Sequence, residues 1–271
     1  MSLVAAFAAS HTPGITAWTE HAQPDRADRF FKGYEALKAR LEASRPDLLV
    51  VITPEHWVNF FLDNMPPFCL GIGESFEGPA EDWLRIPKSA VKGAPKHARA
   101  LFEAMSHEID LSFSEEIILD HGSMIPLSLI TPRMDIPVIP LFINCLTRPM
   151  PPLGRSLRMG QVLGDVVRAW PERVGLIATG GISHWPAMPE AGKINEEFDH
   201  RFLQAITTGR GEEFTRYSDD EIEAEAGPGA YEIRTWLAVA GAVPGGKGEV
   251  LAYEPIPAWA TGCGIAAFHT V

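Results

Sequence analysis

The sequence has few cysteines and no long apolar run, and these shortages exclude several classes of protein. Its 271 residues include three widely separated cysteines, Cys69, Cys145 and Cys263, with no Cys-x-x-Cys pair. We interpret them as reduced core thiols of a cytoplasmic protein. The first ten residues, MSLVAAFAAS, carry no basic leader, and the other apolar runs are strand-sized. We therefore expect neither a signal peptide nor a membrane span.

Positive charge is also scarce. The chain has 23 Lys and Arg residues against 35 Asp and Glu residues, a formal net charge of −12 at pH 7, and no block of five or more basic residues. Because this charge repels phosphates, a general DNA- or RNA-binding role is excluded. Hydrophobic residues make up 46% and charged residues 21% of the chain, so a sizeable buried core is expected and global disorder is not.

Short apolar runs alternate with amphipathic segments along the chain. Eight runs have the length and β-branched content of strands: residues 3–9, 47–53, 68–72, 114–119, 138–143, 174–179, 250–253 and 264–268. Four segments show helical spacing of apolar residues: 25–44, 155–170, 195–208 and 231–242. This alternation predicts an α/β fold, an α/β/α sandwich around a central mixed sheet, in one domain over residues 1–271. The polar segment 74–95 is expected to be an excursion over a site.

Four of the nine histidines share one setting, shortly after a predicted strand and beside turn-forming residues. They are His11 in SHTPG, His56 in TPEHW, His121 in LDHG and His184 in GGISHWP. Loops at the carboxyl ends of strands in open α/β sheets converge on one crevice, and imidazole is a common metal ligand. A single buried histidine is more often a hydrogen-bonded structural residue. Four in the same setting favour a shared site.

A metal site of this kind usually includes a carboxylate, and Glu232 is the candidate. It opens the predicted helix 231–242, whose buried face is apolar. A charge there is costly unless it is paired or bound to a metal, although an acidic residue also complements a helix N-terminus. Both interpretations stay open. Glu223 and Glu225 compete less well because they lie in the acidic run DDEIEAE. Two histidines and one carboxylate are typical of non-haem iron(II) oxygenases, and zinc hydrolases use similar ligands.

As a set, eight segments resemble the class III, LigB-type extradiol ring-cleavage dioxygenases. They span the chain from end to end: SHTPG, FFKGYEALKARL, EHWVNFFLDNMPPFCLGIG, LDHGSMIPLSLI, VIPLFIN, TGGISHWP, KINEEFDHRFL and YEIRTW. The resemblance implies that His11, His56 and Glu232 hold Fe(II). It also implies that His184 is the acid/base histidine and that His121 is a second active-site histidine.

The same resemblance implies extradiol cleavage of a catechol with insertion of both atoms of dioxygen. The expected substrate is a carboxylated catechol such as protocatechuate or a dihydroxyphenyl acid. Expected partners are this small molecule and dioxygen, a second copy of the chain in a homo-oligomer, and, as an option, a small alpha subunit. No nucleic acid or membrane partner is expected. Where the family shows Asp before the second histidine ligand, this chain has Glu55.

Two alternatives stay open: a zinc-dependent hydrolase that uses the same three ligands, and a non-catalytic metal-binding module on the same fold. The presence of both His121 and His184 argues against the module, because metal binding alone does not require them. Arg234 and Ser123 are candidates for contacting a substrate carboxylate. Aromatic and proline residues that flank the predicted ligands are expected to wall the pocket: Trp57, Phe60, Phe61, Trp185 and Pro186.

Overall fold

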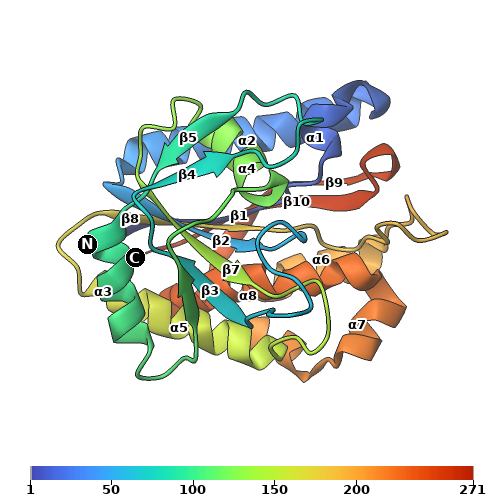
Figure 1. Cartoon of the computed structure of the whole chain (residues 1–271). Helices are drawn as coiled ribbons and strands as arrows, with labels where there is room; N and C mark the ends of the chain where they lie inside the picture. Colours follow the sequence, from blue (N-terminus) through green and yellow to red (C-terminus); the bar gives the residue numbers. More distant parts are fainter. Residues whose placement is uncertain (1, 271) are drawn as a thin grey trace.

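The apolar runs form an eight-stranded mixed sheet with helices packed on both of its faces (Figure 1). This computed structural model describes residues 2–270. The strands are β1 (Leu3–Ala9), β2 (Leu48–Pro54), β3 (Phe68–Gly71), β4 (Ser75–Gly78), β5 (Ser89–Lys92), β6 (Ser112–Ser114), β7 (Val138–Ile143), β8 (Val174–Thr179), β9 (Gly248–Ile256) and β10 (Thr261–Phe268). The order in the large sheet is β6-β3-β7-β2-β8-β1-β10-β9, and β4 pairs with β5 in a separate hairpin.

The centre of the sheet is parallel and its edges are not. β7, β2, β8 and β1 run in the same direction, whereas β3 and β10 lie antiparallel to their inner neighbours. Every residue of β2, β7 and β8 is buried, as expected of parallel strands covered on both faces. The parallel centre therefore brings the carboxyl ends of four strands to one edge of the sheet.

Side chains of successive strand residues divide between two cores. Along β2, Leu48, Val50 and Ile52 join one apolar cluster, while Leu49 and Val51 join the other. Figure 1 shows the helices of these two layers above and below the sheet. The helices are α1 (Gly14–Ala17), α2 (Pro24–Ser44), α3 (Pro95–Met105), α4 (His121–Ile130), α5 (Leu153–Arg168), α6 (Glu196–Thr207), α7 (Asp219–Ala226) and α8 (Ile233–Ala242).

The predicted α/β/α sandwich with a mixed sheet is confirmed, and several predicted segments differ in their bounds. The expected strand 114–119 is wrong beyond Ser114, because β6 ends there and only an isolated bridge joins Ile118 to Glu77. The expected helix 231–242 starts later, since residues Pro228–Glu232 form a 3-10 turn before α8. The excursion 74–95 contains the β4–β5 hairpin.

Among the helices of residues 2–270, none combines the length and the apolar character that crossing a bilayer requires. The expected cytoplasmic location and the single domain over residues 1–271 stay predictions.

Candidate metal centre

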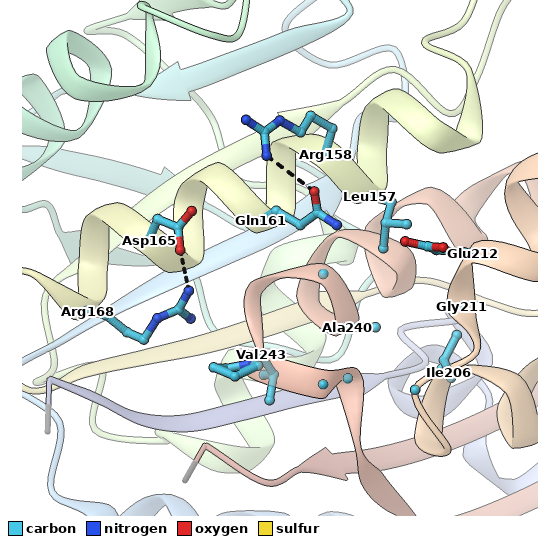
Figure 2. A pocket seen from close by; sticks show the side chains of 15 residues that line it. Leu157, Arg158, Gln161, Asp165, Arg168, Ile206, Gly211, Glu212, Ala240 and Val243 are labelled. Carbon is cyan, nitrogen blue, oxygen red and sulfur yellow. Dashed lines mark hydrogen bonds and ion pairs between the residues drawn. The ribbon is translucent and has the colours of Figure 1, made fainter.

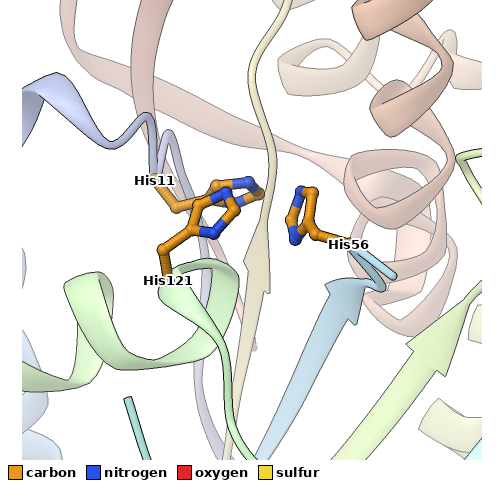
Figure 3. A group of neighbouring side chains, drawn as sticks. All are labelled: His11, His56 and His121. Carbon is orange, nitrogen blue, oxygen red and sulfur yellow. The ribbon is translucent and has the colours of Figure 1, made fainter. Parts of the chain in front are cut away.

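Three histidines from separate parts of the chain meet at the carboxyl edge of the sheet. His11 follows β1, His56 follows β2 and His121 is the first residue of α4. Each offers a ring nitrogen that lies within 4.8 Å of the other two, and Figure 3 shows the rings facing one another. The ring centroids are 5.1 Å apart for His11 and His56 and 4.0 Å apart for His56 and His121. Three of the four histidines expected to share a site therefore lie together, although only His11 and His56 among these three follow a strand.

The Glu232 carboxylate lies beside this cluster. Its Oε1 is 3.3 Å from His56 Nε2, and its Oε2 is 3.7 Å from His11 Nε2. The Gly181 backbone N–H, in the loop after β8, donates to Oε2 at 2.5 Å. The 3-10 turn that places Glu232 before α8 therefore directs the carboxylate into the cluster, as the apolar helix around it suggested.

Asp120 orients the ring of His56. The two side chains lie 2.8 Å apart, from His56 Nδ1 to Asp120 Oδ2, and Asp120 is fully buried. A carboxylate accepts only, so Nδ1 carries a proton, and Nε2 is the nitrogen that faces Glu232. Sequence reasoning missed Asp120, although it directly precedes His121 in the LDHG segment and could have been found there.

Glu55, at the position where the family shows Asp, holds the turn that follows β2. Its buried carboxylate accepts backbone N–H groups from Trp57, Val58 and Asn59 at 2.7, 2.6 and 2.5 Å. Trp57 adopts a left-handed backbone conformation, with φ of 58°. These three hydrogen bonds give three backbone N–H donors of the turn a partner, and so they fix the backbone beside His56.

His121 is held by the excursion between β4 and β5. Glu81 Oε1 lies 2.5 Å from His121 Nδ1 and also accepts the His121 backbone N–H at 3.2 Å. The Trp83 ring lies 6.4 Å from the His121 ring and stacks on Trp18 at 5.9 Å. The excursion therefore does lie over the site, and Glu81 is a further residue that the sequence analysis did not single out.

His184 completes the group of four histidines on the other side of Glu232. Its Nε2 is 3.9 Å from Glu232 Oε1, and its Nδ1 is 3.1 Å from the Ile182 carbonyl oxygen. Because a carbonyl only accepts, Nδ1 is the protonated nitrogen and Nε2 keeps its lone pair. A Cβ at Gly229 would lie 2.2 Å from this ring, so glycine is required there for the close approach.

Burial and the neighbouring charges shift the pKa values of the clustered residues in different directions. Desolvation, together with repulsion from His56 and His121, lowers the pKa of His11 to about 3. For His56, desolvation is outweighed by the Asp120 and Glu232 carboxylates, which raise its pKa. Desolvation of Glu232 is likewise outweighed by the surrounding histidines, and its pKa is lowered. The neutral His11 imidazole and the ionised Glu232 carboxylate are the forms that bind a metal.

The donor set fits a divalent metal ion. Ligand atoms about 2.1 Å from an ion and at right angles to one another lie roughly 3 Å apart. The separations of 3.3 Å and 3.7 Å between Glu232 and the two imidazole nitrogens are close to that spacing. Two imidazoles and one carboxylate suit iron or zinc. The chemistry and the spacing of these imidazoles and the buried carboxylate therefore fit the binding of one divalent ion.

An apolar pocket of about 550 Å³ opens beside the cluster. Of the predicted wall residues, Trp57 and Pro186 line it. Phe60 instead packs on Phe142, with ring centroids 6.1 Å apart, and Trp185 is buried under Lys193. Trp18 and Trp259, which the sequence did not point to, also line the pocket, from segments far apart in the chain.

The two residues expected to contact a substrate carboxylate do not line this pocket, so that expectation is wrong. Arg234 is fully buried, and its guanidinium donates to the carbonyl oxygens of Pro151 and Tyr231 and to Asp219. Ser123 is buried within α4. Arg234 therefore stabilises the segments around α8 and is not available to a ligand.

A second cavity, of about 410 Å³, lies at the other end of α8 (Figure 2). Its arginines are engaged with neighbours on α5: Arg158 donates to Gln161 at 3.4 Å and Arg168 to Asp165 at 2.6 Å. The four histidines and Glu232 are absent from the described residues that line it. The candidate metal ligands and the candidate acid/base histidine therefore all line the first pocket.

Comparisons with known proteins agree with this geometry. Residues 5–264 match the family described as the catalytic LigB subunit of aromatic ring-opening dioxygenase. A 2,3-dihydroxyphenylpropionate/2,3-dihydroxicinnamic acid 1,2-dioxygenase of Klebsiella pneumoniae (strain 342) is 30% identical over 279 residues, covering 84% of this chain and 87% of that protein. The enzyme of the same name from Escherichia coli O139:H28 (strain E24377A / ETEC) is 28% identical, covering 96% and 97%.

A crystal structure of the uncharacterized protein JW3007 from Escherichia coli K12 has the same fold, with a TM-score of 0.63 and 21% identity over 88% of this chain and 92% of that one. The family match covers nearly the whole chain and includes all four clustered histidines and Glu232. The chain therefore belongs to the LigB family and is an extradiol ring-cleavage dioxygenase of that family.

Proposed function

We propose that this protein is a non-haem Fe(II) enzyme that cleaves a catechol ring beside its two hydroxyls and inserts both atoms of dioxygen. The observation that carries the proposal is the approach of Glu232 to His11 and His56, at 3.7 and 3.3 Å between ligand atoms. In this proposal these three side chains hold the metal. When bound, Fe(II) would supply open positions for the catechol oxygens and dioxygen, and a path for electrons between them.

His184 is proposed as the acid/base residue. Its Nδ1 proton is held by the Ile182 carbonyl at 3.1 Å, which leaves the Nε2 lone pair beside the ligand cluster and on the wall of the pocket. A neutral imidazole in this position accepts a proton from a catechol hydroxyl and returns it later in the reaction. Since Gly181 and Gly229 approach the partly buried ring of His184 closely, the ring is held in one orientation.

His121 is proposed as a second active-site histidine. It lines the pocket, and Glu81 accepts a hydrogen bond from its Nδ1, so its Nε2 faces the cluster. From there it can donate or accept a hydrogen bond with a substrate oxygen. The apolar walls exclude bulk water, which strengthens each of these polar contacts.

The resemblance predicts, in addition, a carboxylated catechol as substrate, and the names of the two relatives give a phenylpropionate and a cinnamic acid as theirs. A homo-oligomer, a small alpha subunit and a cytoplasmic location stay predictions as well.

The proposal is tested by loading the protein with Fe(II) under anaerobic conditions and then supplying ¹⁸O₂ and a panel of catechols. We expect one O₂ consumed per catechol and a yellow ring-opened product that carries two ¹⁸O atoms. Oxygen uptake that yields only hydrogen peroxide and quinone, or no uptake with any catechol, would contradict the proposal.

Protein loaded with Zn(II) is the matched control. Zinc has no redox chemistry, so this sample should consume no oxygen. The zinc hydrolase alternative predicts instead that the zinc-loaded protein cleaves ester or amide bonds while the iron-loaded protein leaves catechols intact.

A further inference from the structure

The pocket beside the candidate metal centre has no cationic side chain apart from the histidines of the centre. Among the described residues that line it there is no Lys and no Arg. Its two threonine hydroxyls are occupied, since those of Thr12 and Thr261 donate to the Trp259 carbonyl oxygen at 2.8 and 3.1 Å. The remaining side-chain donors outside the centre are the Cys145 thiol and indole groups, all of them uncharged as donors. A carboxylate bound here would find no opposite charge with which to pair.

Two arginines that are close in the sequence to pocket-lining residues form their ion pairs away from the pocket. Arg234 is buried against Asp219 and two carbonyl oxygens, and Arg148 pairs with Glu223 at 2.9 Å. Other arginines line cavities away from this pocket, among them those of Figure 2 at the opposite end of α8. With a formal net charge of −12, the molecule as a whole also repels anions rather than attracting them.

The surface next to the pocket is also apolar. Trp57 lines both the pocket and a shallow hollow that it shares with Phe61 and Leu62. The exposed fractions of these side chains are 40% for Trp57, 50% for Phe61 and 78% for Leu62. The Trp57 and Phe61 rings stack with centroids 6.5 Å apart. The volume of about 550 Å³ is in the range of pockets that enclose drug-sized ligands, so it exceeds the need of a single ring.

We infer that the ring of the substrate carries an uncharged, apolar substituent, such as an alkyl, aryl or ester group, in place of the carboxylate that the resemblance predicts. This inference rests on the proposed function, because it assumes that the catechol oxygens face the histidine cluster. The substituent then lies against Trp57, Leu146 and Pro186, which line the pocket. Burying a carboxylate there without a partner is costly, whereas burying an apolar group is favourable.

The test compares two substrates that differ in charge and by one methyl group: 3-(2,3-dihydroxyphenyl)propanoate and its methyl ester. With the Fe(II)-loaded protein, we expect kcat/KM from oxygen uptake to be about tenfold or more higher for the ester. Binding is measured separately, under anaerobic conditions, by quenching of tryptophan fluorescence, because Trp18, Trp57 and Trp259 line the pocket. The ester should bind more tightly than the acid by a similar factor.

A variant that should improve cleavage of the acid provides a second test of the inference. Leu146 is half-buried in the pocket lining, just after β7. Leu146→Arg should raise the ratio of acid to ester kcat/KM about tenfold, since it supplies the missing cation. Leu146→Gln, which is polar but neutral, is the control and should leave that ratio close to the wild-type value.

The outcomes separate this inference from the proposed function. If the acid is cleaved as well as or better than the ester, the inference is overturned while the dioxygenase function stands. If the protein consumes no oxygen with any catechol, the proposed function falls and the inference falls with it. A preference for the ester that Leu146→Arg reverses and Leu146→Gln does not would support both.

Discussion

Hydrogen bonds to Nδ1 decide which nitrogen of His56, His121 and His184 faces the ligand cluster. Asp120 and the Ile182 carbonyl occupy Nδ1 of His56 and His184, so both rings direct Nε2 towards Glu232. Partners of this kind fix the tautomer and raise the basicity of a metal ligand. The arrangement of single residues is therefore as important to the site as the identity of the ligands.

Asp120→Asn tests this dependence. The amide keeps the shape and can still accept from His56 Nδ1, but it removes the negative charge that makes His56 a strong ligand. We expect metal affinity to fall roughly 10- to 100-fold, measured by competition with a chelator of known affinity. Asp135→Asn, at an exposed aspartate paired with Arg133, is the control. Unchanged affinity in Asp120→Asn would remove Asp120 from the account.

His184→Gln tests the acid/base role. The variant keeps a polar group in the pocket but cannot exchange a proton near neutral pH. Turnover should fall about 10²- to 10⁴-fold while metal content stays at the wild-type level, as measured by oxygen uptake and elemental analysis. His107→Gln, at an exposed histidine, should behave as wild type. Full turnover in His184→Gln would assign the proton transfer to another group.

Sequence alone could predict His11, His56 and His184, because each follows a buried strand of the parallel centre. It could not predict the contact between Glu81 and His121. Glu81 lies in an irregular stretch between two short strands, and its position depends on tertiary packing and not on any local period.

At the scale of elements, the loop after β8 is fixed by the helix that follows it. Asp199 on α6 accepts the Ser183 backbone N–H at 2.8 Å, the Ser183 hydroxyl at 2.9 Å and the Tyr253 hydroxyl at 2.6 Å. Ser183 directly precedes His184, so this buried carboxylate links α6 and β9 to the loop that carries the histidine. The KINEEFDHRFL segment thus has a structural reason for its aspartate.

The same contact predicts a dependence of stability on pH. Burial raises the pKa of Asp199 from its ordinary 3.8 to about 6, although the hydrogen bonds from Tyr253 and Ser183 act in the opposite direction. The folded state therefore holds a proton that the unfolded state has already released. As pH rises from about 4 to 6, the free energy of unfolding should fall by roughly 2 kcal/mol relative to Asp199→Asn.

Urea unfolding of both proteins between pH 4 and 7 measures this difference. Asp110→Asn, at an exposed aspartate, provides the control for a general change of charge. Parallel stability profiles for wild type and Asp199→Asn would show that Asp199 titrates normally in the fold.

Element boundaries were predicted best where burial on both faces imposes a pattern. The runs 138–143 and 174–179 coincide with β7 and β8, which are buried throughout. Prediction failed for the run 114–119, because β6 lies at the edge of the sheet and its partner β3 ends at Gly71. An apolar run next to a short partner has no neighbour with which to continue the ladder of hydrogen bonds.

At the scale of the whole molecule, the site is assembled from parts of the chain that only the fold brings together. The three proposed ligands follow β1, follow β2 and precede α8, and 176 residues separate His56 from Glu232. The alternation of apolar runs and amphipathic segments predicted the α/β/α sandwich. That fold explains why the ends of β1 and β2 and the start of α8 meet. The apolar pocket walls, by contrast, depend on side chains such as Trp18 and Trp259 whose neighbours no sequence pattern specifies.

The most direct test of the account measures Fe(II) bound per chain, by anaerobic equilibrium dialysis, in wild type and five alanine variants. We predict one ion per chain in wild type, His121→Ala and His184→Ala, and loss of the ion in His11→Ala, His56→Ala and Glu232→Ala, with circular dichroism confirming that each variant is folded. Retention of the ion in folded Glu232→Ala, together with its loss in His121→Ala, would contradict the account and assign the metal to the three histidines.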